Sequence, residues 1–331
     1  MENRKRQKGF GEIIYRKFIR RYKLSEGENW LKLRSLGLGG SDAAAVLGIN
    51  PWKSRLQLWH EKVYKNVPDQ SENIRLKIGK MMEPMIADEY ARKTGRQLEI
   101  RDMKIHPIYS FMIANIDREI VEDDRGPGIL EIKTKNSFVD WSGEDIPMYY
   151  RTQLQHYLEV FDYDWGSFAI FDLGTQNLEI IDVERDNDLI DKLIKEETLF
   201  WGLVTDKIPP EPDTSKACEK FLREHYKESK DITIDLMNNE EAMKWIVVLK
   251  KAKEDAKIAD TLETEAKNHL MSIMGSAEKG MGYNFSIIWR SPKNKEKFDL
   301  DKFKLDHPKM AKEYISSVPQ IRRFTVRWQK M

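Results

Sequence analysis

The sequence has few of the features that mark membrane proteins or proteins of oxidising compartments. Its 331 residues contain one cysteine, Cys218, which can neither form an internal disulfide nor build a cysteine-based metal site. The densest apolar run, at 245–249, is five residues long, whereas a membrane-spanning helix needs about 20. No apolar stretch of the secretory type follows the basic start of the chain. We therefore expect a protein of the reducing cytoplasm.

The sequence also has few histidines and almost no net charge. The six histidines include no pair at helical spacing, which argues against a histidine-based zinc site. The net charge of +1 conceals a basic arm, because residues 1–23 carry nine Lys or Arg and two Glu. An arm of this kind suits a polyanion such as nucleic acid, and it equally suits a solvated tail without a partner.

Apolar spacing predicts three parts: an arm over 1–24, an α/β domain over 25–215 and an α+β appendage over 216–331. The domain should contain a mixed five-stranded sheet flanked by helices. Its expected strands are residues 97–105, 111–121, 128–134, 166–173 and 178–184. The appendage should contain one long helix or a helical hairpin at 238–274, and strands at 280–290 and 321–328.

Helix signals precede the strands. Ser41 or Asp42 can cap a helix that begins after the turn at 37–42. A longer helix is expected over 72–94, ending at Gly95. Between them, Asn50-Pro51-Trp52 stops the first helix, and Trp52 is expected to pack into the core.

Residues 129–134, ILEIKT, raise the question of function. They place Glu131 and Lys133 on one face of an otherwise apolar strand. The strong turn signal before them predicts a hairpin with the preceding strand. Pairing Val121 with Ile129 would bring Asp117 to the same face, within about 5–8 Å of both charged residues.

Two carboxylates that share a buried site repel each other unless a cation neutralises them. Mg²⁺ has this capacity, because it prefers oxygen ligands and keeps several waters. A lysine beside the ion can orient an attacking water or stabilise charge that develops on a phosphate. The pattern of Asp117, Glu131 and Lys133 thus suits phosphodiester hydrolysis. A structural salt-bridge ladder fits these three residues equally well.

Four ordered motifs favour the first interpretation. They are WLKLRSLGLGGSDAAAVLGINPW at 30–52, GKMMEPMIADEY at 79–90, ANIDREI with GILEIKT at 114–134, and RTQLQHYLEV at 151–160. Over about residues 28–210 the sequence resembles the lambda-exonuclease type of phage recombination nucleases, the YqaJ-like branch of the PD-(D/E)xK superfamily. The resemblance implies a restriction-endonuclease-like core.

The resemblance also implies roles. Asp117 and Glu131 correspond to the main metal carboxylates, together with the backbone carbonyl of Ile132. Lys133 corresponds to the catalytic lysine. Gln153 corresponds to the glutamine that orients the lysine or the nucleophile.

Further positions carry weaker implications. Glu83 corresponds to a helical acid that completes the metal site, although an ordinary exposed helix glutamate is the plainer reading. Gln155 and Tyr157 share the motif of Gln153 but lie on other helix faces. Glu119 is a reserve ligand.

Arg34 and Ser41 match the family's pair that binds the 5′-terminal phosphate of duplex DNA. Arginine offers phosphate a bidentate fork, and a helix N-terminus attracts anions. A surface salt bridge for Arg34 and a plain helix cap for Ser41 are the alternatives that the residues leave open.

The resulting hypothesis is a Mg²⁺-dependent exonuclease, with Mn²⁺ also possible, that digests linear double-stranded DNA from 5′ to 3′. Its 3′ single strands would pass to a single-strand annealing protein in phage-type recombination, and the resemblance implies a homotrimer. An endonuclease of the same fold, with the appendage reading DNA, and a silent DNA- or partner-binding relic are the alternatives. The preferred interpretation of the appendage is an element for oligomerisation or partner docking.

Overall fold

The computed structural model describes residues 34–65, 73–136, 146–291, 298–314 and 322–326. The expected basic arm lies outside these residues. The chain divides into two compact units, one through Tyr226 and one from Lys227 onward, which are described separately. In the part of the chain described, no helix is both long and apolar enough to cross a membrane.

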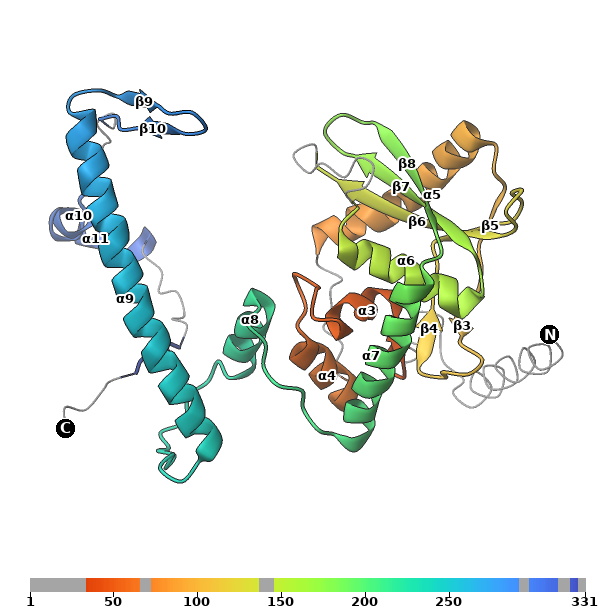
Figure 1. Cartoon of the computed structure of the whole chain (residues 1–331), viewed down its shortest axis with the longest axis horizontal. Helices are drawn as coiled ribbons and strands as arrows, with labels where there is room; N and C mark the ends of the chain where they lie inside the picture. The colour runs from red at the N-terminus through yellow and green to blue at the C-terminus, as the bar shows by residue number, and fades with distance from the viewer. Residues whose placement is uncertain (1–33, 66–72, 137–145, 292–297, 315–321, 327–331) are drawn as a thin grey trace. The chain divides into compact units, whose positions relative to one another are not determined.

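The first unit is built on a five-stranded mixed sheet in the order β2-β5-β6-β7-β8 (Figure 1). Its strands are β2 (Leu98–Glu99), β5 (Arg118–Ile120), β6 (Gly128–Lys135), β7 (Trp165–Asp172) and β8 (Leu178–Glu184). The β6–β7 pair is parallel and the other pairs are antiparallel. The predicted α/β class with a mixed five-stranded sheet is confirmed.

Two predicted strands are each broken in two. The stretch 97–105 supplies β2 and β3 (Lys104–Ile105), and 111–121 supplies β4 (Met112–Ala114) and β5. β3 and β4 leave the large sheet and form a second sheet with β1 (Leu38–Gly39), in the order β1-β4-β3. Pairing of β5 with β6 ends where the Asp117 carboxylate, rather than a backbone carbonyl, accepts the N–H of Ile132 at 2.8 Å.

Helices cover both faces of the large sheet (Figure 1). Helix α5 (Ile74–Thr94) packs on Leu130 and Ile132, whereas α6 (Met148–Phe161) packs on the face that holds Ile129. Because side chains alternate along β6, Glu131 and Lys133 share one face, as expected, and this face is the one that α6 covers. Helix α5 continues through Pro84 and ends at Gly95, whose φ of +73° suits glycine.

A third apolar cluster joins α3 (Gly40–Val46), α4 (Arg55–Tyr64) and α7 (Asn187–Asp206). Helix α8 (Lys216–His225) packs against α4, where the rings of Phe221 and His225 meet His60 at 5.5 and 4.5 Å. The expected division at 215/216 therefore differs from the division that the contacts define, because α8 belongs to the first unit.

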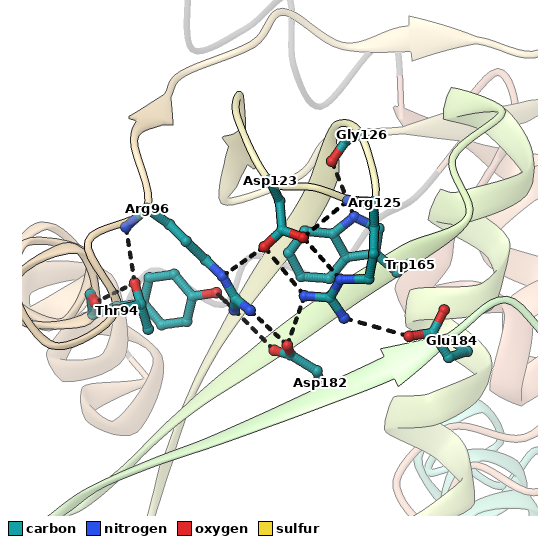
Figure 2. A network of polar contacts seen from close by, with 9 residues as sticks. Thr94, Arg96, Asp123, Arg125, Gly126, Trp165, Asp182 and Glu184 are labelled. Carbon is teal, nitrogen blue, oxygen red and sulfur yellow. Dashed lines mark hydrogen bonds and ion pairs between the residues drawn. The ribbon is translucent and has the colours of Figure 1, made fainter.

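An ion-pair network fixes the β5–β6 hairpin to its neighbours (Figure 2). The guanidinium groups of Arg96 and Arg125 lie 4.8 and 3.6 Å from the ring centroid of the buried Trp165 indole. Both arginines bind Asp123 of the hairpin turn and Asp182 of β8 at 2.7–3.1 Å. The network anchors the turn to strands β7 and β8.

The hairpin register differs by two residues from the predicted one. Glu119 pairs with Ile129, and Ile120 pairs with Gly128. The indole of Trp165 would lie 2.6 Å from a Cβ at position 128, so a glycine is needed at the start of β6. A shift of two keeps every side chain on its predicted face, so the expectation that Asp117 lies on the face of Glu131 is unaffected.

In the second unit, α9 (Glu240–Met274) is one 35-residue helix without a buried residue. Strands β9 (Lys279–Met281) and β10 (Ser286–Ile288) form a hairpin with each other, and α10 (Leu300–Asp306) and α11 (Pro308–Tyr314) follow. The expected strand at 321–328 is wrong over its described residues, 322–326, which form no strand. The turn of the β9–β10 hairpin lies within 280–290, the stretch that was expected to form a single strand.

Candidate active site

Lys133 is the centre of a hydrogen-bonded cluster on the α6 face of β6. Its ammonium group donates to Glu131 Oε1 at 2.6 Å and to Gln153 Oε1 at 3.2 Å. The amide of Gln153 in turn donates to the same Glu131 oxygen at 2.6 Å. The ring of Tyr150, from the first turn of α6, lies 4.6 Å from the ammonium nitrogen. Three sequence-predicted residues thus meet, and Tyr150 joins them although the sequence did not single it out.

Asp117 adds a second carboxylate to this cluster. Burial, and then the charge of Glu131, raises the pKa of Asp117 to about 8. Burial alone would lower the pKa of Lys133, but the carboxylates of Glu131 and Asp117 outweigh it and raise that pKa. The lysine is therefore held as a cation by the two acids it accompanies.

The other two acidic candidates are each engaged elsewhere. Glu83 approaches from α5 and accepts from Arg118 at 2.8 Å, while its charge contributes to the raised pKa of Asp117 after burial and Glu131. Glu119, the reserve ligand, is buried and accepts from Arg101 and Tyr163. Within the described residues, no three acidic, histidine or cysteine side chains converge as a ready metal site. Glu119 is accounted for as a structural ion pair.

The chemistry of the donors that do meet fits a divalent cation. Asp117 and Glu131 offer hard carboxylate oxygens, and Mg²⁺ is commonly held by one or two carboxylates with water completing the shell. Burial, and then the charge of Glu131, raises the pKa of Asp117, and a cation between the two acids would offset both effects. The carbonyl of Ile132 belongs to β6 and lies between Glu131 and Lys133 in the sequence.

The two residues expected to bind phosphate are in contact with each other. Arg34 donates to the hydroxyl of Ser41, which is exposed in the first turn of α3. The helix cap differs from both expected ones, because Gly39 precedes the helix and Asp42 reaches back to its N–H at 3.2 Å. The Ser41 hydroxyl therefore meets the arginine instead of capping the helix.

Tyr157 connects this pair with the lysine cluster. Its hydroxyl accepts from Gln153 at 3.2 Å. The two residues are four apart on α6 and share a helix face, so the expectation that Tyr157 lies on another face than Gln153 is wrong. A Cβ at Gly40 would lie 2.5 Å from the Tyr157 ring, so α3 begins directly against α6. Burial raises the pKa of Tyr157, the charge of Glu131 raises it further, and Arg34 acts in the opposite direction. The acidic cluster and the Arg34–Ser41 pair are therefore neighbours.

A buried lysine supports the segment that carries Arg34. Lys62 of α4 is buried and donates to Asp42 at 2.7 Å, to the Arg34 carbonyl at 2.9 Å and to the Gly37 carbonyl at 2.7 Å. Burial would raise the pKa of Asp42, but Lys62, then Lys53 and Arg34, hold it well below its ordinary value. Sequence reasoning missed Lys62, because a lysine on a helix is ordinarily solvated.

Gln155 has a structural position. Its amide donates to the Glu184 carbonyl at 2.8 Å and its oxygen accepts from the Asp186 N–H at 2.8 Å, which joins α6 to the link between β8 and α7. These contacts do not involve the lysine cluster, which agrees with the expectation that Gln155 lies on another face of the helix than Gln153.

His156, on the helix that carries Gln153, leads to a prediction about pH. Its two ring nitrogens meet Glu197 Oε1 at 2.8 Å and the Ile113 carbonyl at 3.0 Å. The Ile113 carbonyl can only accept, so Nε2 donates, and a charged ring also donates from Nδ1 to Glu197. Burial would lower the pKa of His156, but Glu197 outweighs burial and raises it above 6.5.

Because the folded-state pKa is the higher one, this contribution to stability is complete below pH 6.5 and is lost as the pH rises through the raised pKa. We expect His156→Gln to lower the free energy of unfolding by about 1.5–3 kcal/mol below that pH, the worth of a hydrogen bond to a charged group. Urea unfolding at several pH values measures the difference. A difference that stays constant with pH would show that the ring is not charged.

The fold and this cluster define a class: a mixed α/β protein in which Glu131 and Lys133 of the central strand and Asp117, just before β5, form a partly buried site beside an Arg–Ser pair. Residues 29–164 match the YqaJ-like viral recombinase domain. The protein YqaJ of Bacillus subtilis (strain 168) is 31% identical over 312 residues, covering 91% of this chain and 94% of that protein. The chain belongs to the YqaJ-like viral recombinase family, which confirms the resemblance drawn from the motifs.

Solved structures of low identity also match. An alkaline exonuclease, LHK-Exo, from Laribacter hongkongensis is 20% identical, with a TM-score of 0.47, over 60% of this chain and 97% of that one. Its complex with dAMP gives the same identity and coverage with a TM-score of 0.48. A phage-related exonuclease from Haemophilus somnus 129PT is 16% identical, with a TM-score of 0.33, over 54% of this chain and 99% of that one.

Proposed function

We propose that this protein is a nuclease, and more specifically a Mg²⁺-dependent exonuclease, with Mn²⁺ as the second candidate metal, that digests one strand of linear double-stranded DNA from its 5′ end. One observation carries the proposal: Tyr157 links the partly buried cluster of Asp117, Glu131 and Lys133 to an Arg–Ser pair suited to a terminal phosphate. A salt-bridge ladder that served only stability would have no need of the Arg34–Ser41 pair beside it.

Asp117, Glu131 and the Ile132 carbonyl would hold the divalent cation in this proposal. When bound, such a cation supplies positive charge to the scissile phosphate and lowers the pKa of a bound water. Lys133 has three N–H donors, of which Glu131 and Gln153 take two. The remaining donor can bind a phosphate oxygen and stabilise the charge that develops there. Gln153 holds the lysine in place.

The Arg34–Ser41 pair would bind the 5′-terminal phosphate and so select the strand. A guanidinium group can give two parallel hydrogen bonds to one phosphate, and the serine hydroxyl adds another. Contacts of this type carry no sequence information, so digestion should depend on the end and not on the sequence.

The remaining proposals follow from this reaction. Digestion of one strand from its 5′ end leaves a 3′ single strand, which a strand-annealing protein would bind for recombination. A ring-shaped homotrimer in the cytoplasm is the proposed assembly, consistent with the family resemblance.

Digestion of three DNA forms tests the proposal: linear duplex with 5′-phosphate ends, the same duplex with 5′-hydroxyl ends, and a closed circle, each with Mg²⁺ or with a chelator. We expect cleavage of linear DNA only, faster with the 5′-phosphate and abolished by the chelator. Arg34→Ala should lower the rate on phosphorylated ends by roughly 10- to 100-fold, the loss of charged hydrogen bonds. Arg92→Ala, whose side chain is exposed on α5, should keep the wild-type preference.

Each other outcome contradicts a definite part of the proposal. Cutting of the circle would identify an endonuclease of the same fold. DNA binding without cleavage of any form would identify a binding protein. An Arg34→Ala variant that still prefers 5′-phosphate ends would remove the Arg34–Ser41 pair from the mechanism.

A further inference from the structure

Trp52 does not pack into the core, contrary to the expectation from the sequence. It lies in the loop between α3 and α4, and its side chain is 63% exposed. The loop is nevertheless ordered by its own hydrogen bonds, because the Asn50 side chain accepts the N–H groups of Trp52 and Lys53 at 2.9 and 3.0 Å. This Asx turn holds a large apolar ring in an exposed position.

The indole is the outer end of a line of aromatic rings that leads to Lys133. Trp52 meets Tyr149 at 5.0 Å between ring centroids, with the ring planes at 79°. Tyr149 meets Tyr150 at 4.4 Å, and Tyr150 lies 4.6 Å from the Lys133 ammonium nitrogen. Residues from two distant parts of the sequence therefore form one continuous surface that ends at the candidate active site.

We propose that Trp52, supported by Tyr149, is a stacking site for one base of the DNA strand held at the active site. The proposal rests on the proposed function. Because one ring meets the other edge-on, at least one face of the indole is not covered by Tyr149. Such a face accepts any of the four bases, since every base has a π-face.

The position of Trp52 favours a nucleobase over a protein side chain as the occupant. Three contacts of 5.0 Å or less separate it from Lys133. This span corresponds to at most about four nucleotides of a stacked strand at about 3.4 Å each. A strand whose phosphate lies at Lys133 would therefore bring a nearby base within reach of the indole. Stacking there would hold the strand end without reading its sequence.

The test measures DNA binding, with cleavage prevented by a chelator. The first probe is a short labelled duplex with a 5′-phosphate. Further probes form a series in which one nucleotide near that end, at a different position in each probe, is replaced by an abasic residue. Fluorescence anisotropy gives the Kd of the full-length protein. We expect Trp52→Ala to bind about 5- to 150-fold more weakly, the range for loss of one base–aromatic stack. Trp52→Phe should stay close to wild type.

Two comparisons separate stacking from other effects. Tyr64→Ala removes a ring of matching exposure, 62%, away from the cluster, and should bind like wild type. One abasic position should weaken binding to wild type and not weaken it further in Trp52→Ala, because both changes remove the same stack.

The outcomes are distinguishable from a failure of the proposed function. If wild type binds no duplex end, the proposed function and this inference both fail. If wild type binds but Trp52→Ala binds equally well, the stacking site alone is refuted. Equal losses for Trp52→Ala and Trp52→Phe, or an abasic series without a sensitive position, would refute it as well.

Discussion

Replacing Lys133 with alanine is expected to lower the rate of DNA cleavage by about 10²- to 10⁴-fold, the range for loss of a positioned catalytic group. The substitution removes the cation that both Glu131 and Asp117 hold in the charged form. It leaves the Glu131 carboxylate bound by the Gln153 amide, so the local structure keeps one of its hydrogen bonds. The loss should therefore appear in the chemical step.

Single-turnover cleavage of 5′-phosphorylated linear duplex, at saturating protein, measures this step. The Kd for the same duplex, measured with a chelator, should change far less than the rate. Lys135→Ala is the matched control, because Lys135 lies on the same face of β6 but pairs with Glu179 of β8 at 2.9 Å. Equal rate losses in the two variants would mean that any positive charge on β6, and not Lys133 in particular, supports cleavage.

The sequence predicted the face of the sheet better than the pairing of its strands. Period-two alternation alone placed Glu131 and Lys133 together, since Leu130 and Ile132 had to enter the core. The register of the hairpin could not be obtained in this way. It depends on Trp165 and its two arginines, which come from three separate segments and meet only in the folded sheet.

Residues whose position depends on tertiary contacts were the hardest to predict. Trp52 reads as a core residue, because large apolar rings are mostly buried, and its exposure follows from the Asx turn at Asn50. Lys62 reads as a solvated helix residue, whereas three oxygen acceptors from a distant segment make its burial possible. The motifs identified Arg34 and Ser41, but they could not identify what holds them in place.

Lys62→Met should be the most destabilising of the substitutions considered, at about 3–5 kcal/mol of unfolding free energy, the cost of breaking a buried ion pair. The Lys62 side chain is 3% exposed. Methionine fills a similar volume but leaves the Asp42 carboxylate without this partner and two carbonyls without their donor. Urea unfolding of the full-length protein, compared with wild type, gives the loss.

A double-mutant cycle with Asp42→Asn tests whether the ion pair causes the loss. The double variant should be more stable than the two single losses predict, because a neutral asparagine side chain at this position no longer leaves a buried charge unpaired. Losses that simply add would contradict this account.

The Lys62→Met substitution should also affect the phosphate-binding pair, since Lys62 binds the carbonyl of Arg34. At a temperature where the variant remains folded, its preference for 5′-phosphate ends should decrease while cleavage of 5′-hydroxyl ends persists, because Lys133 and Gln153 lie on other elements. If the preference were unchanged in a destabilised Lys62→Met protein, the buried lysine would stabilise the fold without positioning the phosphate-binding arginine.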